Sequence, residues 1–325
     1  MAEEEKATNA SNENMDKKNP NTVKKISIED LIKGVFDGYG SDATEDGKKR
    51  FNQILTKYLK QEASKNNCYK EYNIVVLYDE STLVKGDADS IYNAVTKFTD
   101  EKKPLLLILY SRGGSAASAY LIGKLCREYS DGSFVVSVPR FAKSAATLIT
   151  CGANEVHMGS LSELGPIDPQ INRLPALGLK NSVEHIAELA KRYPEASDMF
   201  AKYLKDSLPL INLGYYERVA ESAVQYAEKL LNTHSHLLPK EGKDIAYELV
   251  YKYKDHGFVI DSYEAMEIFG EKIIKSNTDE YQLGNTIYKA LDMVSRFFGF
   301  LNYDFYFIGS FDSEANVIKR AAAND

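Results

Sequence analysis

The stretch LLLILYSRGGS, residues 105–115, decides the fold. Its first five residues are all apolar, without polar alternation, which is typical of a strand buried on both faces of a sheet. Gly113 and Gly114 then predict a tight turn, because glycine adopts positive φ angles without steric cost. An apolar face that includes Ala119 and Ile122 follows and predicts a helix. A buried strand, a turn and a helix in this order indicate an α/β unit.

The same alternation extends from this stretch in both directions, through about residue 160. It predicts a parallel sheet whose two faces are covered by helices, hence an α/β fold. From residue 182 to 254 the sequence is typical of helices alone, so we expect a helical C-terminal half. The further predicted strands are 73–78, 134–138 and 155–158, and the further predicted helices are 87–98 and 143–151.

Composition divides the chain into four segments. Residues 1–25 are polar and predict a disordered tail. Residues 26–68 predict an N-terminal helical extension in two pieces, broken near residues 38–42. Residues 69–275 hold the predicted α/β domain. Residues 276–325 form an aromatic-rich C-terminal extension, in which Tyr303, Phe305 and Phe307 alternate as in a strand with one buried face. We interpret this last part as an edge strand or core cover; an oligomer contact is the alternative.

Charge and composition exclude several classes of protein. The 325 residues are 44% hydrophobic and 27% charged, as in a globular protein. The formal net charge of −7 disfavours nucleic-acid binding, which needs a basic face. Three widely spaced cysteines, Cys68, Cys126 and Cys151, predict neither a disulfide framework nor a zinc site, and the histidines lack metal-ligand spacing. No apolar run has the length of a membrane span or a secretory signal, so we expect a soluble cytoplasmic protein without a cofactor.

A second stretch, PRFAKSAATLI at residues 139–149, follows the next buried strand. Ser144 lies there among small residues at the predicted start of a helix, where backbone N–H groups lack helical acceptors. Functional sites of open α/β sheets lie at the carboxyl ends of strands, so Ser144 and the glycine turn should share one edge. The arrangement suits an oxyanion. The alternatives are a turn without a ligand, and a serine that only caps its helix.

Two further motifs complete a pattern, LSELGPIDPQ at residues 161–170 and DHGFVI at residues 255–260. Together with the two turns they resemble the serine dehydrogenase proteinase family, in the signal peptide peptidase A-like branch of the Clp protease/crotonase superfamily. The resemblance covers about 200 residues and is strongest over residues 73–170. It implies a Clp protease/crotonase-like fold, a superhelix of repeated β-β-α units. It also implies a serine peptidase that acts on peptides or proteins and forms a homo-oligomer.

The resemblance also implies roles for individual residues. Ser144 is the expected acylating nucleophile. The N–H of Ala145 would give one oxyanion donor, and that of Gly114, or of Gly113, the other. Asp168 aligns with the place where the Clp branch carries its histidine base, and a carboxylate is a poor base for an alcohol near pH 7.

The expected base is therefore a lysine in a Ser-Lys mechanism, as in the signal peptide peptidase branch. The candidates are Lys191, Lys202 and Lys205, and spacing slightly favours Lys191. We discount Lys143, since neighbouring side chains on a helix do not face each other. We expect His256 to fix a turn rather than to act as a base.

Two other functions remain open at this stage. If no lysine reaches Ser144, the chain is a catalytically inactive scaffold or binding protein with the same fold. A crotonase-like enzyme acting on an acyl-CoA thioester would need paired carboxylates, for which Glu163 and Asp168 are the candidates. That interpretation leaves the pattern around Ser144 unexplained.

Overall fold

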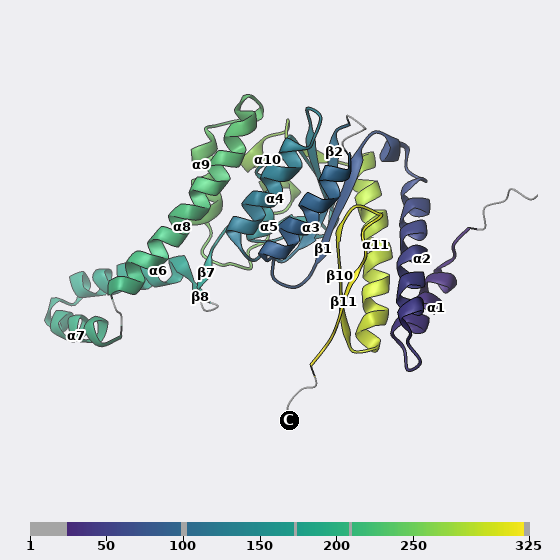
Figure 1. The fold of residues 1–325 in the computed structure, drawn as a ribbon. Coiled ribbons are helices and arrows are strands. Elements are labelled where there is room, and N and C mark those ends of the chain that lie inside the picture. The colour runs from purple at the N-terminus through teal and green to yellow at the C-terminus, as the bar shows by residue number, and fades with distance from the viewer. Residues whose placement is uncertain (1–24, 99–102, 172–173, 208–209, 322–325) are drawn as a thin grey trace, which may run out of the picture.

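A computed structural model describes residues 25–98, 103–171, 174–207 and 210–321, so residues 1–24 of the predicted tail lie outside it. One large twisted sheet forms its centre, with helices on both faces (Figure 1). The strand order is β11-β10-β1-β2-β3-β5-β9. The bounds are β1 Asn73–Asp79, β2 Leu105–Ser111, β3 Phe134–Val138, β5 Glu155–Met158, β9 Ile274–Ser276, β10 Tyr303–Gly309 and β11 Asn316–Lys319. Short strands β4 (Phe141–Ala142) and β6 (Glu163–Leu164) continue it beside β2.

The predicted mixed α/β fold with a mostly parallel sheet is confirmed. Strands β1, β2, β3, β5 and β9 run parallel, and every residue of β1, β2 and β3 is buried. Because helices cover both faces of the sheet, side chains on both faces of these strands are buried, which explains the continuous apolar runs in their sequences. The expectation of a C-terminal half made only of helices is incomplete, because β9, β10 and β11 belong to the same sheet.

The aromatic alternation near residue 305 does form a strand, β10. It is not at the edge, because β10 pairs antiparallel with β1 on one side and with β11 on the other. Phe305 and Phe307 are buried against the sheet, whereas Tyr303 is only partly covered. Strand β10 thereby supplies partners for the backbone groups along one edge of β1, which would otherwise stay exposed.

Helices divide between two hydrophobic clusters, one on each face of the sheet. One face carries α3 (Lys85–Val95), α4 (Ala116–Glu128), α5 (Ala145–Thr150), α8 (Leu210–Leu231), α9 (Gly242–Tyr247) and α10 (Ser262–Phe269). The other carries α1 (Ile28–Tyr39), α2 (Glu45–Ala63) and α11 (Asp279–Phe300), so the N- and C-terminal segments share one core with the sheet. The predicted break between α1 and α2 is present, and Ser27 and Thr44 cap the two helices.

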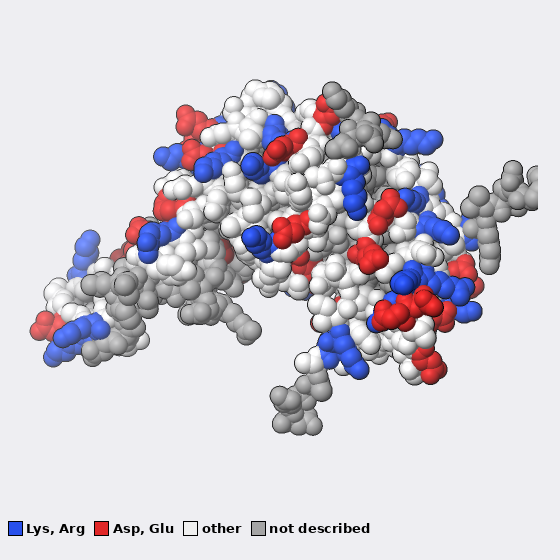
Figure 2. All heavy atoms as spheres, viewed as in Figure 1, with Lys and Arg blue, Asp and Glu red and all other residues white. Residues whose placement is uncertain are grey.

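An arm of helices extends from this body at the left of Figure 1. It consists of α6 (Ala176–Arg192), α7 (Ser197–Ser207) and the beginning of α8, with the hairpin β7 (Gln170–Ile171) and β8 (Leu174–Pro175) at its base. None of the helices in the described ranges has the length and hydrophobicity needed to cross a bilayer. On the face seen in Figure 2, basic and acidic side chains are interspersed. The remaining short helices are 67–70, 96–98, 194–196, 232–237 and 248–252.

Replacing Phe298 with alanine should destabilise the fold strongly. Its ring is fully buried and stacks on Phe305 with centroids 5.2 Å apart, and it meets Tyr39 edge-on at 4.9 Å. Loss of a buried phenylalanine costs about 3–5 kcal/mol of unfolding free energy. Phe300→Ala on the same helix is the control, because this ring is 84% exposed. Urea denaturation should separate the two variants; equal losses would contradict the packing described here.

Stability should also depend on pH through His234. Its ring is buried, and this desolvation, helped by the nearby Arg127 and His236, lowers its pKa from 6.5 to about 4. Below about pH 6.5 the His234 imidazole is therefore protonated in the unfolded chain but stays neutral in the folded chain. The unfolding free energy consequently falls as the pH falls toward 4. Between pH 7 and 5 the loss should be about 1–2 kcal/mol. His234→Gln should remove this part of the loss in denaturant titrations, and His236→Gln should not.

Candidate active site

The glycine turn and the serine turn meet at the carboxyl end of β2. Strand β4 pairs with the last residue of β2, Ser111, and the Lys143 N–H donates to the Ser111 carbonyl at 3.0 Å. A Cβ atom added to Gly113 would lie 3.0 Å from Ser144 Cβ and 2.8 Å from Ala145 N. Gly113 itself has φ +94°. Only glycine can occupy this position without a steric clash. The glycine turn and the serine turn are therefore in direct contact.

Ser144 has an unusual backbone for a residue with a side chain. Its φ is 51° and its ψ is −118°, directly before α5. Non-glycine residues rarely adopt positive φ, and such strain is concentrated at functional sites. Although Ser144 is at the N-cap position of α5, its hydroxyl makes no capping hydrogen bond. In the described part of the chain no hydrogen bond is recorded for that hydroxyl, and the residue is half-buried.

The start of α5 is held in place by Thr147. Its buried hydroxyl lies 2.7 Å from the carbonyl oxygens of both Ala142 and Gly165. The Gly165 N–H donates back to the same hydroxyl oxygen at 3.1 Å. One side chain thus ties α5 to β4 and to the segment after β6. No local sequence pattern pointed to this role for Thr147.

The backbone N–H groups of the two turns differ in whether they donate to the protein. Among the residues that the structure describes, no acceptor is recorded for the N–H of Gly114 or of Ala145. The Gly113 N–H, in contrast, donates to the Ser111 hydroxyl at 3.1 Å. Of the two glycines, Gly114 is therefore the one whose N–H group has no protein acceptor among the described residues. Gly114 is exposed, so a substrate can approach its N–H group.

The three candidate lysines are not brought to Ser144. Lys191 lies on α6, and Lys202 and Lys205 lie on α7, all exposed on the projecting arm. Within the described ranges, no hydrogen bond or ion pair is recorded for any of these amines.

The Lys143 amine, in contrast, is engaged in contacts with other parts of the protein. Its amine forms an ion pair with Glu163 at 3.0 Å. It also donates to the carbonyl oxygens of Leu164 at 3.1 Å and Phe258 at 3.2 Å. Lys143 therefore joins the serine turn to β6 and to the closing motif, residues 255–260. Glu163 is engaged in this contact and is not paired with Asp168, as the crotonase-like alternative would need.

Asp168 and His256, considered separately in the sequence, face each other in the structure. The His256 Nδ1 atom lies 3.7 Å from Asp168 Oδ2. Asp168 is buried, and its Oδ1 atom and His256 Nδ1 are buried side-chain atoms for which no hydrogen-bond partner is recorded in the described residues. His256 does not fix the local turn as expected. The Asp255 carboxylate does so by accepting from the Gly257 N–H at 3.0 Å.

Arg112 is exposed beside the glycine turn. Its guanidinium lies 5.3 Å from the centre of the Phe141 ring and 3.5 Å from a Glu80 carboxylate oxygen. Such an exposed ion pair contributes little to stability. Arg112 is therefore accessible from solvent at the rim of the site.

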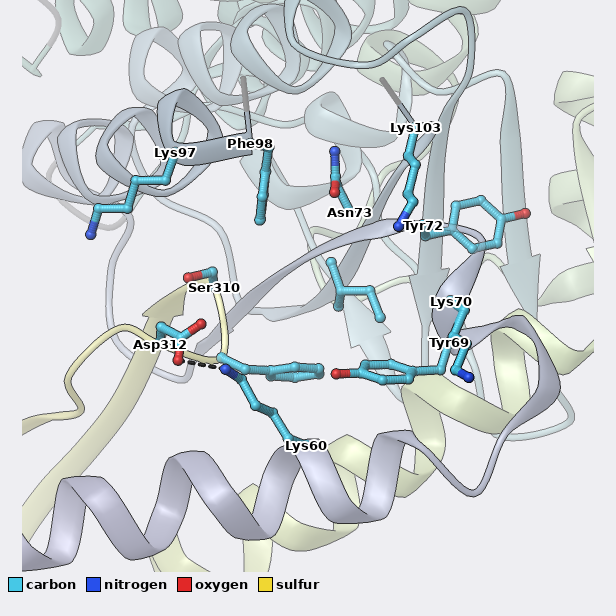
Figure 3. Close-up of a pocket in the computed structure, with 12 residues that line it drawn as sticks. Lys60, Tyr69, Lys70, Tyr72, Asn73, Lys97, Phe98, Lys103, Ser310 and Asp312 are labelled. Atoms are coloured by element: carbon cyan, nitrogen blue, oxygen red, sulfur yellow. Dashed lines mark hydrogen bonds and ion pairs between the residues drawn. The ribbon is translucent and has the colours of Figure 1, made fainter. Parts of the chain in front are cut away.

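One cavity lies away from this site. It has a volume of about 580 Å³ and opens at the amino ends of the strands, near the start of β1, whereas Ser144 is at their carboxyl ends (Figure 3). Lys60, which lines it, forms an ion pair with Asp312 at 2.6 Å. Lys70, Lys97, Tyr69 and Phe98 also contribute to its wall.

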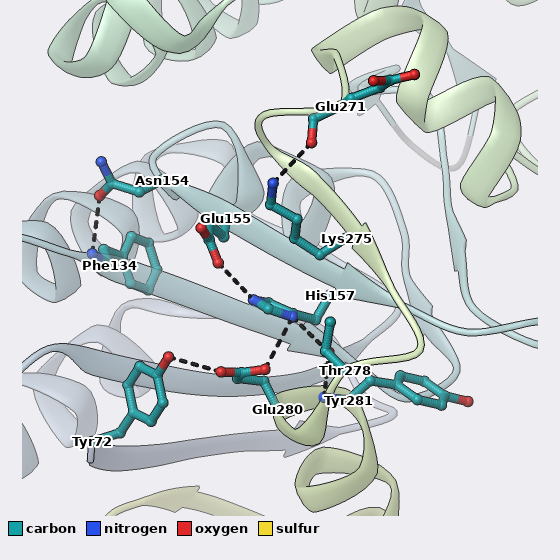
Figure 4. A network of polar contacts seen from close by, with 10 residues as sticks. All are labelled: Tyr72, Phe134, Asn154, Glu155, His157, Glu271, Lys275, Thr278, Glu280 and Tyr281. Atoms are coloured by element: carbon teal, nitrogen blue, oxygen red, sulfur yellow. Dashed lines mark hydrogen bonds and ion pairs between the residues drawn. The ribbon is translucent and has the colours of Figure 1, made fainter. Parts of the chain in front are cut away.

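A buried polar network surrounds His157 on β5 (Figure 4). The ring contacts the Thr278 hydroxyl at 2.7 Å and the carboxylates of Glu155 at 3.2 Å and Glu280 at 3.5 Å. The Tyr72 hydroxyl donates to Glu280 at 2.9 Å. These contacts join β5 to the start of α11. No group of three metal-ligating side chains suited to a metal ion occurs in the described residues.

None of the three cysteines, all of which lie in described residues, is a suitable alternative nucleophile. All three are buried and free. Burial raises the pKa of the Cys68 thiol to about 12, and it raises the pKa values of Cys126 and Cys151 as well. Thiols in such surroundings stay protonated, and it is the thiolate that reacts.

Comparison with known proteins supports the pattern of motifs. Residues 48–197 match a family described as ClpP-like SDH-type serine proteinase. The protein MJ0137 of Methanocaldococcus jannaschii is 24% identical over 204 residues, which cover 60% of this chain and 68% of that protein. MJ1495 of the same organism is 32% identical over 93 residues, and the match spans 29% of this chain and 31% of that protein. Both relatives are named as uncharacterized proteins.

Two solved structures are similar in part to this chain, and both are mutant forms of a protein described as 1510-N membrane-bound stomatin-specific protease. The first has a TM-score of 0.42 and 13% identity, with 66% of this chain and 84% of the other covered. The second, a mutant in complex with a substrate peptide, has a TM-score of 0.40 and 14% identity, with 65% and 78% covered.

Proposed function

We propose that this protein is a serine peptidase with Ser144 as its nucleophile, because residues 48–197 match the ClpP-like SDH-type serine proteinase family. One observation supports this most directly. Gly113 packs against Ser144, whose backbone is strained, and among the described residues the neighbouring N–H groups of Gly114 and Ala145 have no acceptor. This is the arrangement that acyl transfer needs, a nucleophile next to donors for the developing oxyanion.

The proposed reaction proceeds in two steps. The Ser144 oxygen attacks the carbonyl carbon of a peptide bond and loses its proton to a base, while the carbonyl oxygen becomes an oxyanion between the two N–H groups. The C–N bond then breaks, and the proton passes to the leaving amine. Water next attacks the Ser144 ester, and its hydrolysis releases the acid and restores the hydroxyl. Loss of one oxyanion donor typically costs about 10²–10³ in rate.

The Ser-Lys form of this mechanism stays a prediction. A lysine of the arm can serve as the base only if its amine becomes buried near Ser144, which lowers a lysine pKa. Contact of the arm with a second copy of the chain would meet that condition. This ties the lysine hypothesis to the expected homo-oligomer, and both are tested together by Lys191→Ala, Lys202→Ala and Lys205→Ala in the full chain.

The proposed activity can be tested with a library of unstructured peptides incubated with the full chain and analysed by mass spectrometry. We expect products cut at internal peptide bonds, absent from an incubation with Ser144→Ala. A chain that cleaves no peptide or unfolded protein would favour the inactive scaffold instead.

A further inference from the structure

The cavity at the amino ends of the strands has no part in the reaction proposed for Ser144. Its volume of about 580 Å³ lies within the range of about 300–1,000 Å³ that is usual for small-molecule sites. Its wall combines the end of α2, the segments that lead into β1 and β2, and the turn after β10 (Figure 3). Segments distant in sequence therefore form one hollow, which exists only in the folded chain.

Positive charge predominates in the lining of this cavity. Of the described residues that line it, one is acidic, Asp312, and four are basic, namely Lys60, Lys70, Lys97 and Lys103. Four positive charges and one negative charge leave a net charge of +3, in a chain whose net charge is −7. Charges of one sign that gather in a hollow raise the local concentration of oppositely charged ligands. The cavity is therefore suited to an anion.

Part of this positive charge is not neutralised by the protein. Lys60 forms its ion pair with Asp312, at 2.6 Å. For the exposed amines of Lys70 and Lys97, in contrast, no hydrogen bond or ion pair is recorded within the described ranges. A lysine ammonium group is a compact charge with three N–H donors, and it binds phosphate oxygens well. These two amines can therefore bind an anionic ligand without first breaking a contact within the protein.

Aromatic rings form another part of the wall. The rings of Tyr69 and Phe311 lie side by side, with centroids 6.3 Å apart and planes inclined by 29°. In Figure 3 they form a nearly flat row, and Phe98 lies on the opposite side of the cavity. Tyr69 and Phe98 are only half-buried, so both rings remain accessible. A planar ligand ring can stack on such a surface.

We propose that this cavity binds a nucleoside phosphate, with the base on the aromatic rings and the phosphate groups at the lysines. A nucleoside phosphate combines in one molecule a planar ring and several negative charges on a chain of phosphates. An aromatic carboxylate carries a single charge and would satisfy one lysine only. Several lysines spread around the opening therefore favour the longer, more highly charged ligand.

This binding site is separate from the proposed active site. Ser144 lies at the carboxyl ends of the strands, whereas the cavity opens at their amino ends, beside Asn73 and Ile74 at the start of β1. The nucleotide would be bound without a covalent step, so this proposal does not depend on the peptidase function. Ser144→Ala should accordingly bind nucleotide as tightly as wild type.

The test is isothermal titration calorimetry of the full chain with ADP, GDP, CDP and UDP, in buffer without divalent metal ions. We expect at least one of these nucleotides to bind, and its affinity to fall as salt is added, because salt screens exposed charges. The corresponding nucleoside lacks the phosphates, and pyrophosphate lacks the ring. Each of these should bind about tenfold more weakly than the nucleotide, or weaker still.

Paired lysine variants separate the cavity from a general effect of charge. Lys70→Ala/Lys97→Ala should weaken nucleotide binding about tenfold or more. Lys49→Ala/Lys57→Ala is the matched control, because it removes the same charge from exposed positions of α2 outside the cavity, and it should bind like wild type. Circular dichroism of each variant shows whether it is folded.

Two single substitutions test the separate parts of the wall. Asp312→Asn should tighten nucleotide binding, because it releases the Lys60 amine for the ligand. Tyr69→Leu should weaken nucleotide binding about fivefold or more and leave pyrophosphate binding unchanged, because it removes only the ring. Tyr263→Leu is the control for this change, since Tyr263 is 81% exposed on α10.

Three results would overturn the proposal. The first is that none of the four nucleotides binds to the wild-type chain. The second is that pyrophosphate binds as tightly as the nucleotides, which would leave the aromatic rings without a role. The third is that the two paired lysine variants lose equal affinity, because the binding would then depend on overall charge and not on the cavity.

Discussion

Ser144→Ala should lower peptide cleavage by at least about 10⁴-fold, because removal of the nucleophile leaves only the oxyanion donors and substrate binding to accelerate the reaction. The fold should be unaffected. The Ser144 hydroxyl does not cap α5, so its loss leaves no helix end unsatisfied. We expect the unfolding free energy to change by less than about 1 kcal/mol.

The measurement is the initial cleavage rate on one peptide selected from the library, together with urea denaturation of the same samples. Ser160→Ala is the matched control, since Ser160 is exposed in the loop after β5 and should leave both quantities unchanged. A Ser144→Ala chain that keeps even a tenth of wild-type activity would show that another group attacks the substrate.

Gly113→Ala should inactivate the protein through its backbone. At φ +94°, the new Cβ would lie 2.5 Å from the Lys143 carbonyl oxygen and 2.8 Å from Ala145 N. Both are backbone atoms, so the serine turn must shift. We expect labelling of Ser144 by a fluorophosphonate probe to fall by about 10²-fold or more, since small displacements of reacting groups cost that much. The unfolding free energy should fall by about 2 kcal/mol or more.

Gly86→Ala provides the contrast for this substitution. A Cβ at Gly86 meets no atom within 4 Å, and the residue lies in α3, where alanine is the better helix former. This variant should label like wild type and be as stable or slightly more stable. Normal labelling of Gly113→Ala would mean that Ser144 does not depend on the glycine turn.

Much of the fold could be predicted from local patterns. The apolar runs of β1, β2 and β3 indicate strands buried on both faces, and such strands occur in parallel sheets covered by helices. The two turns could be predicted to meet, because the carboxyl ends of parallel strands lie at one edge. The structure brings Gly113 and Ser144 into contact there.

What could not be predicted depends on segments distant in sequence. The alternation in β10 indicates a strand but not its neighbours, so its place between β1 and β11 had no local sign. Asp168 and His256 are 88 residues apart, and only the bridge between Leu164 and Ile260 aligns them. Helical spacing likewise cannot tell that α6 and α7 project from the body with their lysines exposed.

The most direct test of the central claim is to treat the full chain with a fluorophosphonate probe and locate the adduct by peptide mass spectrometry. The account predicts one modified residue, Ser144, and no labelling after heat denaturation, because the reactivity comes from the folded turn. An adduct that forms equally well on Ser144→Ala, or no adduct on the folded wild-type chain, would contradict it.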